Sequence, residues 1–240
     1  MTEHISKQFD QDLEAIRSRM LQMGGLVESH VRSAISGYLG ADAEAAAKAI
    51  AGDAKVNELE LAIDNDLGQI IVRRQPAASD LRLILAASKI VTDLERIGDE
   101  ATKVARMAHD AHAGASPPSP RLVALGHISD VAIGMLRRSL DAFARLDAAA
   151  AAKVAGEDAA IDEEFRAIIR QLITFMMEDP RTITTSLQHV WVAKAFERIG
   201  DHAKNIAEYV IYIVRGTDVR HTSFEYMEKE AQLEADEGGE

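Results

Sequence analysis

Apolar residues recur every three or four positions along most of the chain, the spacing that gathers side chains on one face of an α-helix. One stripe joins Leu94, Ile97 and Val104, and a second of the same kind joins Phe196, Ile199 and Ile206. No long segment alternates apolar and polar residues in the way of a half-buried strand. The pattern therefore predicts a protein built of helices.

The prolines mark where these helices stop. Pro76 and Pro180 stand alone, whereas Pro117, Pro118 and Pro120 fall together in a short Ser/Pro segment. Proline inside a helix costs about 3 kcal/mol, so the stretches between these breaks stay helical. We predict six long helices and one short one, over residues 6–39, 43–74, 77–113, 120–146, 149–178, 180–214 and 224–233.

The chain also repeats itself. The five residues from Glu95 to Asp99 recur unchanged from Glu197 to Asp201, and Gly52 to Asn57 resembles Glu157 to Asp162. A period of this length indicates a duplicated domain rather than a solenoid of short repeats. We predict an all-α fold of two tandem, pseudo-symmetric three-helix bundles. The bundles cover residues 1–114 and 121–216, with a linker at 115–120 and a partly disordered tail at 217–240.

Composition limits the partners, metal ligands and cellular location that can be expected. The net charge of −12 opposes binding to nucleic acid and favours cations or basic protein surfaces as partners. The chain has no cysteine, which leaves oxygen and histidine as metal ligands. No run of apolar residues is long enough to span a membrane, and the start lacks the apolar core of a signal peptide. We expect a soluble, cytoplasmic protein in which Trp191, Met176 and Met177 belong to the core.

Acidic side chains carry the clearest chemical signal. Glu95 and Asp99 lie one helical turn apart, away from the apolar stripe, so their carboxylates are neighbours. Two such pairs on adjacent helices surround one groove with oxygen ligands, which suits manganese, magnesium or iron. Exposed acidic pairs are common on solvated faces, but the unchanged five-residue repeat favours a metal site. The predicted ligands are Glu60, Asp64, Glu95, Asp99, Asp158, Asp162, Glu197 and Asp201, with His202 as a further candidate.

No nucleophile and base can be paired, so the sequence predicts a non-enzyme. One alternative is a metal-storage or metal-dependent redox bundle, although the Glu-x-x-His spacing of di-iron bundles is absent. Another is a histidine phosphotransfer domain, which needs an exposed histidine on a helix. Its candidates are His30, His109, His112 and His127.

Several ordered motifs together resemble one family. Residues 75–82 and 93–99 in the first half, and 197–208 in the second, are similar to the two signatures of the PhoU proteins, regulators of bacterial phosphate uptake and signalling. Segments 141–145 and 216–221 are similar to the family as well. The resemblance covers about residues 5 to 221.

The resemblance implies two similar three-helix bundles and a non-catalytic adaptor that represses the phosphate-starvation response. Its partners would be the phosphate ABC transporter ATPase PstB and the sensor histidine kinase PhoR, and homodimer formation stays open. The partner-contact candidates are Asp141, Arg145, Arg220 and His221. Some members carry metal clusters on acidic pairs that map onto the eight carboxylates above. In the aligned halves, however, Asp158 matches Asp53 rather than Glu60.

Overall fold

The computed structural model describes residues 2–76, 78–112 and 121–233, all of them helix, turn or irregular chain. The all-α prediction is confirmed. The predicted linker at 115–120 and the end of the tail from residue 234 lie outside these ranges. The elements are α1 (Thr2–Gly40), α2 (Ala43–Arg74), α3 (Ala78–His112), α4 (Arg121–Arg145), α5 (Ala148–Gly156), α6 (Asp158–Glu178), the 3₁₀ turn η1 (Pro180–Thr182), α7 (Ile183–Arg215) and α8 (Phe224–Gln232).

The helix predicted over residues 149–178 is wrong in one respect, because a turn at Glu157 divides it into α5 and α6. Glycine precedes this turn for a steric reason. A Cβ on Gly156 would lie 2.5 Å from the Phe224 ring of α8, which packs on α5. The last long helix also starts later than predicted. Asp179 caps η1 by accepting from the Arg181 N–H, so α7 begins only at Ile183.

The duplication is visible in backbone detail. Asp42 and Asp147 cap α2 and α5 with nearly the same backbone angles, at φ −94° and −95°. The residues before them, Ala41 and Leu146, both adopt the left-handed conformation, at φ 54° and 52°. The repeated glycine has the same use in each half, because Gly98 lets α3 approach α2 closely and Gly200 lets α7 approach α6.

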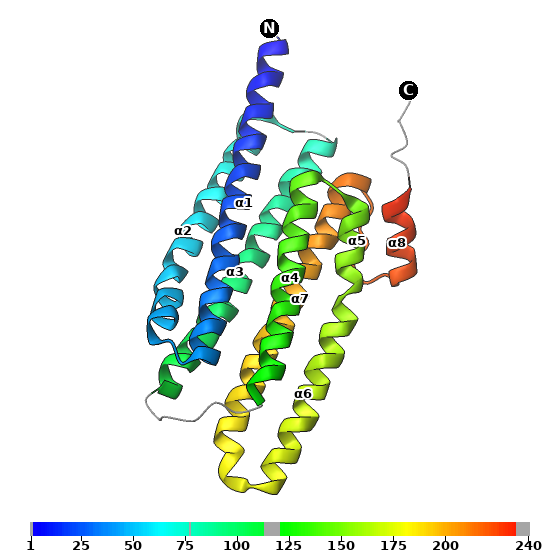
Figure 1. Ribbon diagram of the computed structural model, residues 1–240. Coiled ribbons are helices and arrows are strands. Elements are labelled where there is room, and N and C mark those ends of the chain that lie inside the picture. Colours follow the sequence, from blue (N-terminus) through cyan, green and yellow to red (C-terminus); the bar gives the residue numbers. More distant parts are fainter. Residues whose placement is uncertain (1, 77, 113–120, 234–240) are drawn as a thin grey trace.

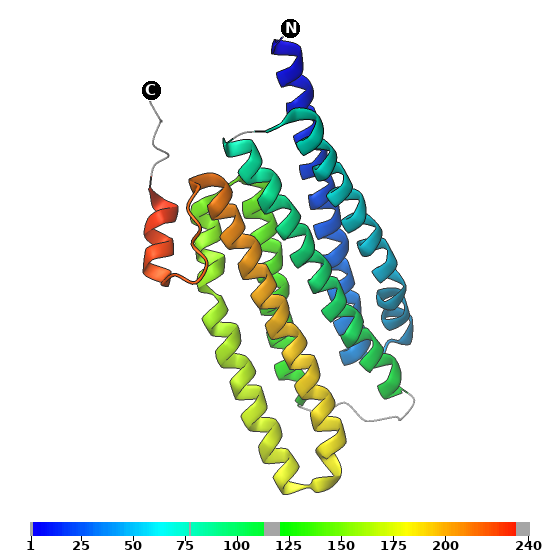
Figure 2. The same ribbon diagram turned by 180° about the vertical axis from the view of Figure 1, so that it is seen from behind.

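The two halves form one body. Helices α1, α3, α4 and α7 lie at its centre, and α2 and the α5–α6 segment flank them on opposite sides (Figures 1 and 2). A single hydrophobic cluster runs through both halves and includes the two predicted stripes. Leu94, Ile97 and Val104 are fully buried, as are Phe196, Ile199 and Ile206.

The far end of the second half departs from the expected core. The hairpin of α6 and α7 extends beyond the ends of the other helices (Figures 1 and 2). Met177 is 80% exposed, and Trp191 is 61% exposed although its neighbours Val192 and Ala193 are buried, so the expectation that both are core residues is wrong. Among the described helices, none combines the length and apolar character needed to cross a membrane.

Buried polar contacts join α3 to α7 where the halves meet. His202 Nδ1 lies 2.7 Å from Asp93 Oδ1, which also accepts from the Asn205 side chain. Nearby, the Arg198 guanidinium lies 2.6 Å from the buried carboxylate of Glu100. Histidine 202 thus serves the junction between halves, and the structure does not place it with the neighbouring Asp201 as a metal ligand.

Candidate functional site

The first acidic groove lies between α2 and α3. It contains Glu60 and Asp64 from α2 with Glu95 and Asp99 from α3, the four carboxylates predicted for this half. Ser88 of α3 donates a hydrogen bond to Asp64 Oδ1 of α2 at 3.0 Å. This contact shows which face of α2 lies opposite which face of α3. Each acidic pair is spaced by one turn on a face turned away from the core stripe.

Like charges make the first groove electrostatically costly. Burial raises the pKa of Glu60, and the carboxylates of Glu95 and Asp64 raise it further. Burial likewise raises the pKa of Glu95, with Asp99 as the next cause. The Arg96 guanidinium lies 3.5 Å from Glu95 and 3.9 Å from Asp99, so it offsets only part of this repulsion. A bound cation would stabilise the groove.

The second acidic groove lies between α6 and α7. It contains Asp158 and Asp162 of α6 with Glu197 and Asp201 of α7. Burial and the nearby carboxylates raise the pKa of Asp201 to about 6. Burial is the largest cause, followed by Glu197 and then Asp158. Although its spacing sets Glu197 away from the apolar stripe, its side chain is buried, with 8% exposed.

Lysines already occupy the second groove. Lys194 Nζ lies 2.5 Å from one oxygen of Glu197 and 2.6 Å from the other, and Lys204 Nζ lies 2.7 Å from Asp158 Oδ2. The other oxygen of Asp158 is buried without a hydrogen-bond partner. In the first half, threonine stands at both lysine positions, as Thr92 and Thr102. The second groove therefore holds two lysines in close contact with its carboxylates, whereas in the first groove Arg96 lies at the longer distance of 3.5 Å from Glu95.

The structure settles the register of the two upstream helices. Thr102 donates to Asp53 at 3.1 Å, in the place where Lys204 contacts Asp158. Asp158 is thus the equivalent of Asp53, as the aligned sequences indicate. Asp53 belongs to the first groove and is missing from the predicted ligands, although its match with Asp158 was visible in the sequence.

The donor set of the first groove fits a hard cation. Besides its carboxylates, it offers the side-chain oxygen of Asn57, which is buried and has no hydrogen-bond partner. Within the described residues, no three His, Asp or Glu side chains are arranged to hold one ion in their present rotamers. Carboxylates on neighbouring turns would have to rotate toward a shared point.

The comparisons with known proteins agree on one family. A PhoU domain matches residues 20–108 and again residues 125–210. The phosphate-specific transport system accessory protein PhoU homolog of Pseudomonas putida is 50% identical over 97% of this chain and 90% of its own length. The PhoU protein of Escherichia coli K12 is 43% identical over 95% of this chain and 94% of its own length.

The chain belongs to the PhoU family. The crystal structure of PhoU from Pseudomonas aeruginosa superposes with a TM-score of 0.84 at 48% identity, over 87% of this chain and 100% of that one. A PhoU structure from Streptococcus pneumoniae superposes with a TM-score of 0.80 at 26% identity, over 88% and 99%. The two PhoU matches cover both acidic grooves and the junction between them.

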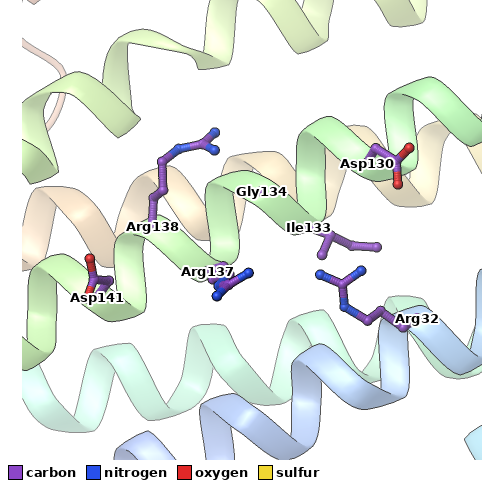
Figure 3. A pocket seen from close by; sticks show the side chains of 7 residues that line it. All are labelled: Arg32, Asp130, Ile133, Gly134, Arg137, Arg138 and Asp141. Carbon is purple, nitrogen blue, oxygen red and sulfur yellow. The ribbon is translucent and has the colours of Figure 1, made fainter.

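Asp141 and Arg145, two of the partner-contact candidates, form an ion pair with each other on α4. Asp141 also lines a groove of about 470 Å³. Figure 3 shows that three arginines of this groove, Arg32, Arg137 and Arg138, lie between Asp141 at one end and Asp130 at the other. Arg32 pairs with Glu28 and Arg138 with Glu157, so this groove carries charges of both signs.

The other two partner-contact candidates lie elsewhere, in the loop between α7 and α8. Arg220 is held by Asp218, at 2.6 Å for the closest contact, and donates to the Tyr209 hydroxyl at 3.1 Å. This hydrogen bonding lowers the pKa of Asp218 to about 2. His221 is exposed and adopts a left-handed φ of 62°. The four candidates therefore come from two elements, α4 and the loop after α7.

The histidines give little support to phosphotransfer. His30 is only 4% exposed, contacts the Ala49 carbonyl oxygen, and has its pKa lowered by burial. His127 is exposed but lies 2.5 Å from Glu164, and His109 is exposed on α3. The His112 side chain lies outside the described residues.

Proposed function

We propose that this PhoU-family chain is a cytoplasmic, non-catalytic adaptor that represses the phosphate-starvation response and modulates phosphate uptake. Its relatives are named as accessory proteins of the phosphate-specific transport system, and this likeness over nearly the whole chain is the observation that carries the proposal. The partners would be the transporter ATPase PstB and the sensor kinase PhoR. The adaptor would transmit the state of the transporter to the kinase, because it would bind the different conformations of these partners with unequal affinity.

The fold supports an adaptor in two ways. The shared core and the buried contacts of Asp93 and Glu100 make the halves one rigid body, so surfaces on both can engage partners at fixed distances. The candidate contacts Arg145 and Arg220 lie on separate elements, so each can be substituted without changing the other.

A pull-down with purified kinase and ATPase, in high and low phosphate, tests this function. The adaptor should retain at least one partner and respond to the phosphate level. Arg145→Glu should weaken capture of one partner, whereas Arg106→Glu, an equal charge change on exposed α3, should not. Capture of neither protein in either condition would overturn the adaptor proposal.

A second proposal concerns the first acidic groove, which would bind manganese, magnesium or iron as a structural ion. Support comes from the mutual repulsion of Glu60 and Glu95, the free oxygen of Asn57, and threonine where the other groove has lysine. When bound, the ion would supply positive charge between α2 and α3. It would thereby offset the repulsion that raises the carboxylate pKa values.

Titration of the metal-free protein with Mn²⁺, followed by electron paramagnetic resonance and by thermal unfolding, tests the metal proposal. Mn²⁺ should bind and raise the Tm of the native protein. Glu95→Gln with Asp99→Asn should abolish both effects, whereas Glu197→Gln with Asp201→Asn should leave them largely intact. Binding that survives the first pair of substitutions would exclude this groove as the site. Rapid oxidation of added ferrous iron would instead favour metal storage.

A further inference from the structure

The duplication sets two equivalent arginines opposite each other. Asp42 and Asp147 are equivalent caps, and ten positions before them stand Arg32 on α1 and Arg137 on α4. The same offset matches the buried apolar positions along both helices, which supports this register. Figure 3 shows the guanidinium groups of the two arginines turned toward one another across the groove between α1 and α4. Two like charges therefore face each other where the halves meet.

The two helices that carry these arginines are packed closely on both sides of the groove. A Cβ on Gly24 of α1 would lie 2.6 Å from Leu140 of α4, and a Cβ on Gly126 of α4 would lie 3.5 Å from Leu39 of α1. These contacts show that the helices run antiparallel, and both arginines fall between them along the chain. The packing thus fixes the points from which the two arginine side chains extend.

The equivalent arginines differ in their partners. Arg32 contacts Glu28, one turn earlier on α1, through Nε and Nη2. In the second half Ile133 stands at the position of Glu28, and within the described residues Arg137 makes no hydrogen bond or ion pair. The pair on α1 is exposed, so it contributes little, and it leaves Nη1 of Arg32 without a described partner. An acceptor that lies between the two guanidinium groups would stabilise both.

The other residues of the groove limit what that acceptor can be. Arg138 is directed away from the facing pair and contacts Glu157, and Asp130 and Asp141 stand at the two ends (Figure 3). A long acidic segment would meet these two aspartates and be repelled, whereas a single anionic group can lie between the arginines. The groove encloses about 470 Å³ above the apolar side chain of Ile133, a volume in the range of small-molecule sites.

We propose that the groove between α1 and α4 binds the phosphate group of a small hydroxylated metabolite, such as a nucleotide. Arg32 and Arg137 would donate to its phosphate oxygens from opposite sides, because a guanidinium group can donate to two oxygens at once. Asp130, which has no hydrogen bond or ion pair among the described residues, would accept from a hydroxyl or amino group of the same ligand.

The net charge of the chain does not prevent this binding. A charge of −12 opposes anions at long range, but exposed charges are screened over about 8 Å at physiological ionic strength. The guanidinium groups in contact with the ligand therefore decide the affinity. This ligand site goes beyond the adaptor function and does not depend on it.

Isothermal titration calorimetry of the full chain with ATP, AMP and inorganic phosphate tests the proposal. EDTA is present throughout, so that a metal ion in an acidic groove cannot hold the ligand. ATP or AMP should bind more tightly than inorganic phosphate. Arg32→Gln and Arg137→Gln should each weaken that binding about tenfold, because each removes a charged donor. Arg106→Gln is the matched control, since Arg106 is exposed on α3 and likewise has no partner among the described residues.

Gly134→Leu tests the groove without changing the net charge. It places a side chain among the lining residues and favours the helix, so it should abolish binding while the circular dichroism spectrum stays helical. Undiminished binding by this variant would overturn the proposal, as would equal losses for Arg137→Gln and Arg106→Gln or no binding of any ligand. Inorganic phosphate bound as tightly as ATP and AMP would overturn the larger ligand and assign the groove to free phosphate.

Discussion

Lys204 stands in the second half where Thr102 stands in the first, and each contacts the equivalent aspartate of the preceding helix. The lysine brings a fixed positive charge to Asp158, whereas the threonine gives Asp53 a hydrogen bond without charge. The second groove is thereby partly neutralised by its own lysines, whereas the carboxylates of the first groove have the weaker contacts of Arg96, at 3.5 and 3.9 Å.

Replacing both groove lysines should convert the second groove into a cation-dependent one. Lys194→Thr with Lys204→Thr removes the positive charges beside Glu197 and Asp158. We expect the metal-free protein to lose about 1–2 kcal/mol of unfolding free energy, because carboxylates at short distance then repel. Added Mn²⁺ should recover much of this loss, as measured by urea unfolding with and without the ion.

The reverse exchange supplies the control. Thr92→Lys with Thr102→Lys should stabilise the metal-free protein and remove its response to Mn²⁺. If both exchanges changed the metal response in the same direction, the lysines would not be what distinguishes the grooves.

The contact of Arg198 with Glu100 should matter more than its counterpart in the first half. Arg198→Met leaves the buried Glu100 carboxylate with Lys103 alone, at 2.9 Å, and should cost about 2 kcal/mol. Arg96→Met, at the equivalent position, removes only surface pairs and should cost less than about 0.5 kcal/mol. Chemical unfolding of both variants measures the difference, and equal costs would mean that the junction pair has no special weight.

Glu208 should make stability depend on pH. Burial is the main cause that raises its pKa to about 7, above the value of about 4.3 for an unfolded chain. Between these values the folded protein holds more protons than the unfolded one, so stability should fall as the pH rises from about 4 to about 7. Asp201, with a pKa of about 6, acts in the same direction.

Glu208→Gln removes this contribution, because the amide does not ionise. Relative to the native protein, the variant should gain roughly 3–4 kcal/mol at pH 8 and nothing at pH 4. Urea unfolding across that range measures the gain. Parallel curves for the two proteins would show that Glu208 ionises as easily when folded as when unfolded.

The repeated glycine should be less replaceable in the second half. A Cβ on Gly200 would lie 2.8 Å from the buried side chain of Ile161, whereas a Cβ on Gly98 would lie 3.3 Å from Val56. Gly200→Ala should therefore destabilise the fold by about 1–3 kcal/mol. Gly98→Ala should be near neutral, because the gain in helix propensity of about 1 kcal/mol offsets the tighter contact. Comparison of thermal unfolding for the two variants gives the answer.

Periodicity and proline positions were enough to predict the helices, since Leu94 and Ile97 are buried by the spacing that defines an amphipathic helix. The turn at Glu157 was not predicted, because the contact of Gly156 with the distant Phe224 cannot be seen in the local sequence. Trp191 was assigned to the core from its apolar character, but it lies on the exposed face of α7 while its neighbour Val192 is buried. The clustering of Glu95 with Asp99 followed from helical spacing. The lysines in the second groove were readable in the sequence, but their contacts depend on how α6 meets α7.

The polar contacts between α3 and α7 use different residues in each half, so one half cannot replace the other at this interface. Asp93 meets His202, and the residue at the position of His202 in the first half is Glu100. Two copies of the first half, joined in the same way, would keep an arginine beside Glu100 but would press Asp93 against a glutamate. Two copies of the second half would set a histidine beside Arg198. Each half therefore selects the other over itself. If the chain is cut between the halves, the two fragments should associate with each other in preference to themselves. A chain that carries the same half twice should have a weaker interface between α3 and its repeated copy.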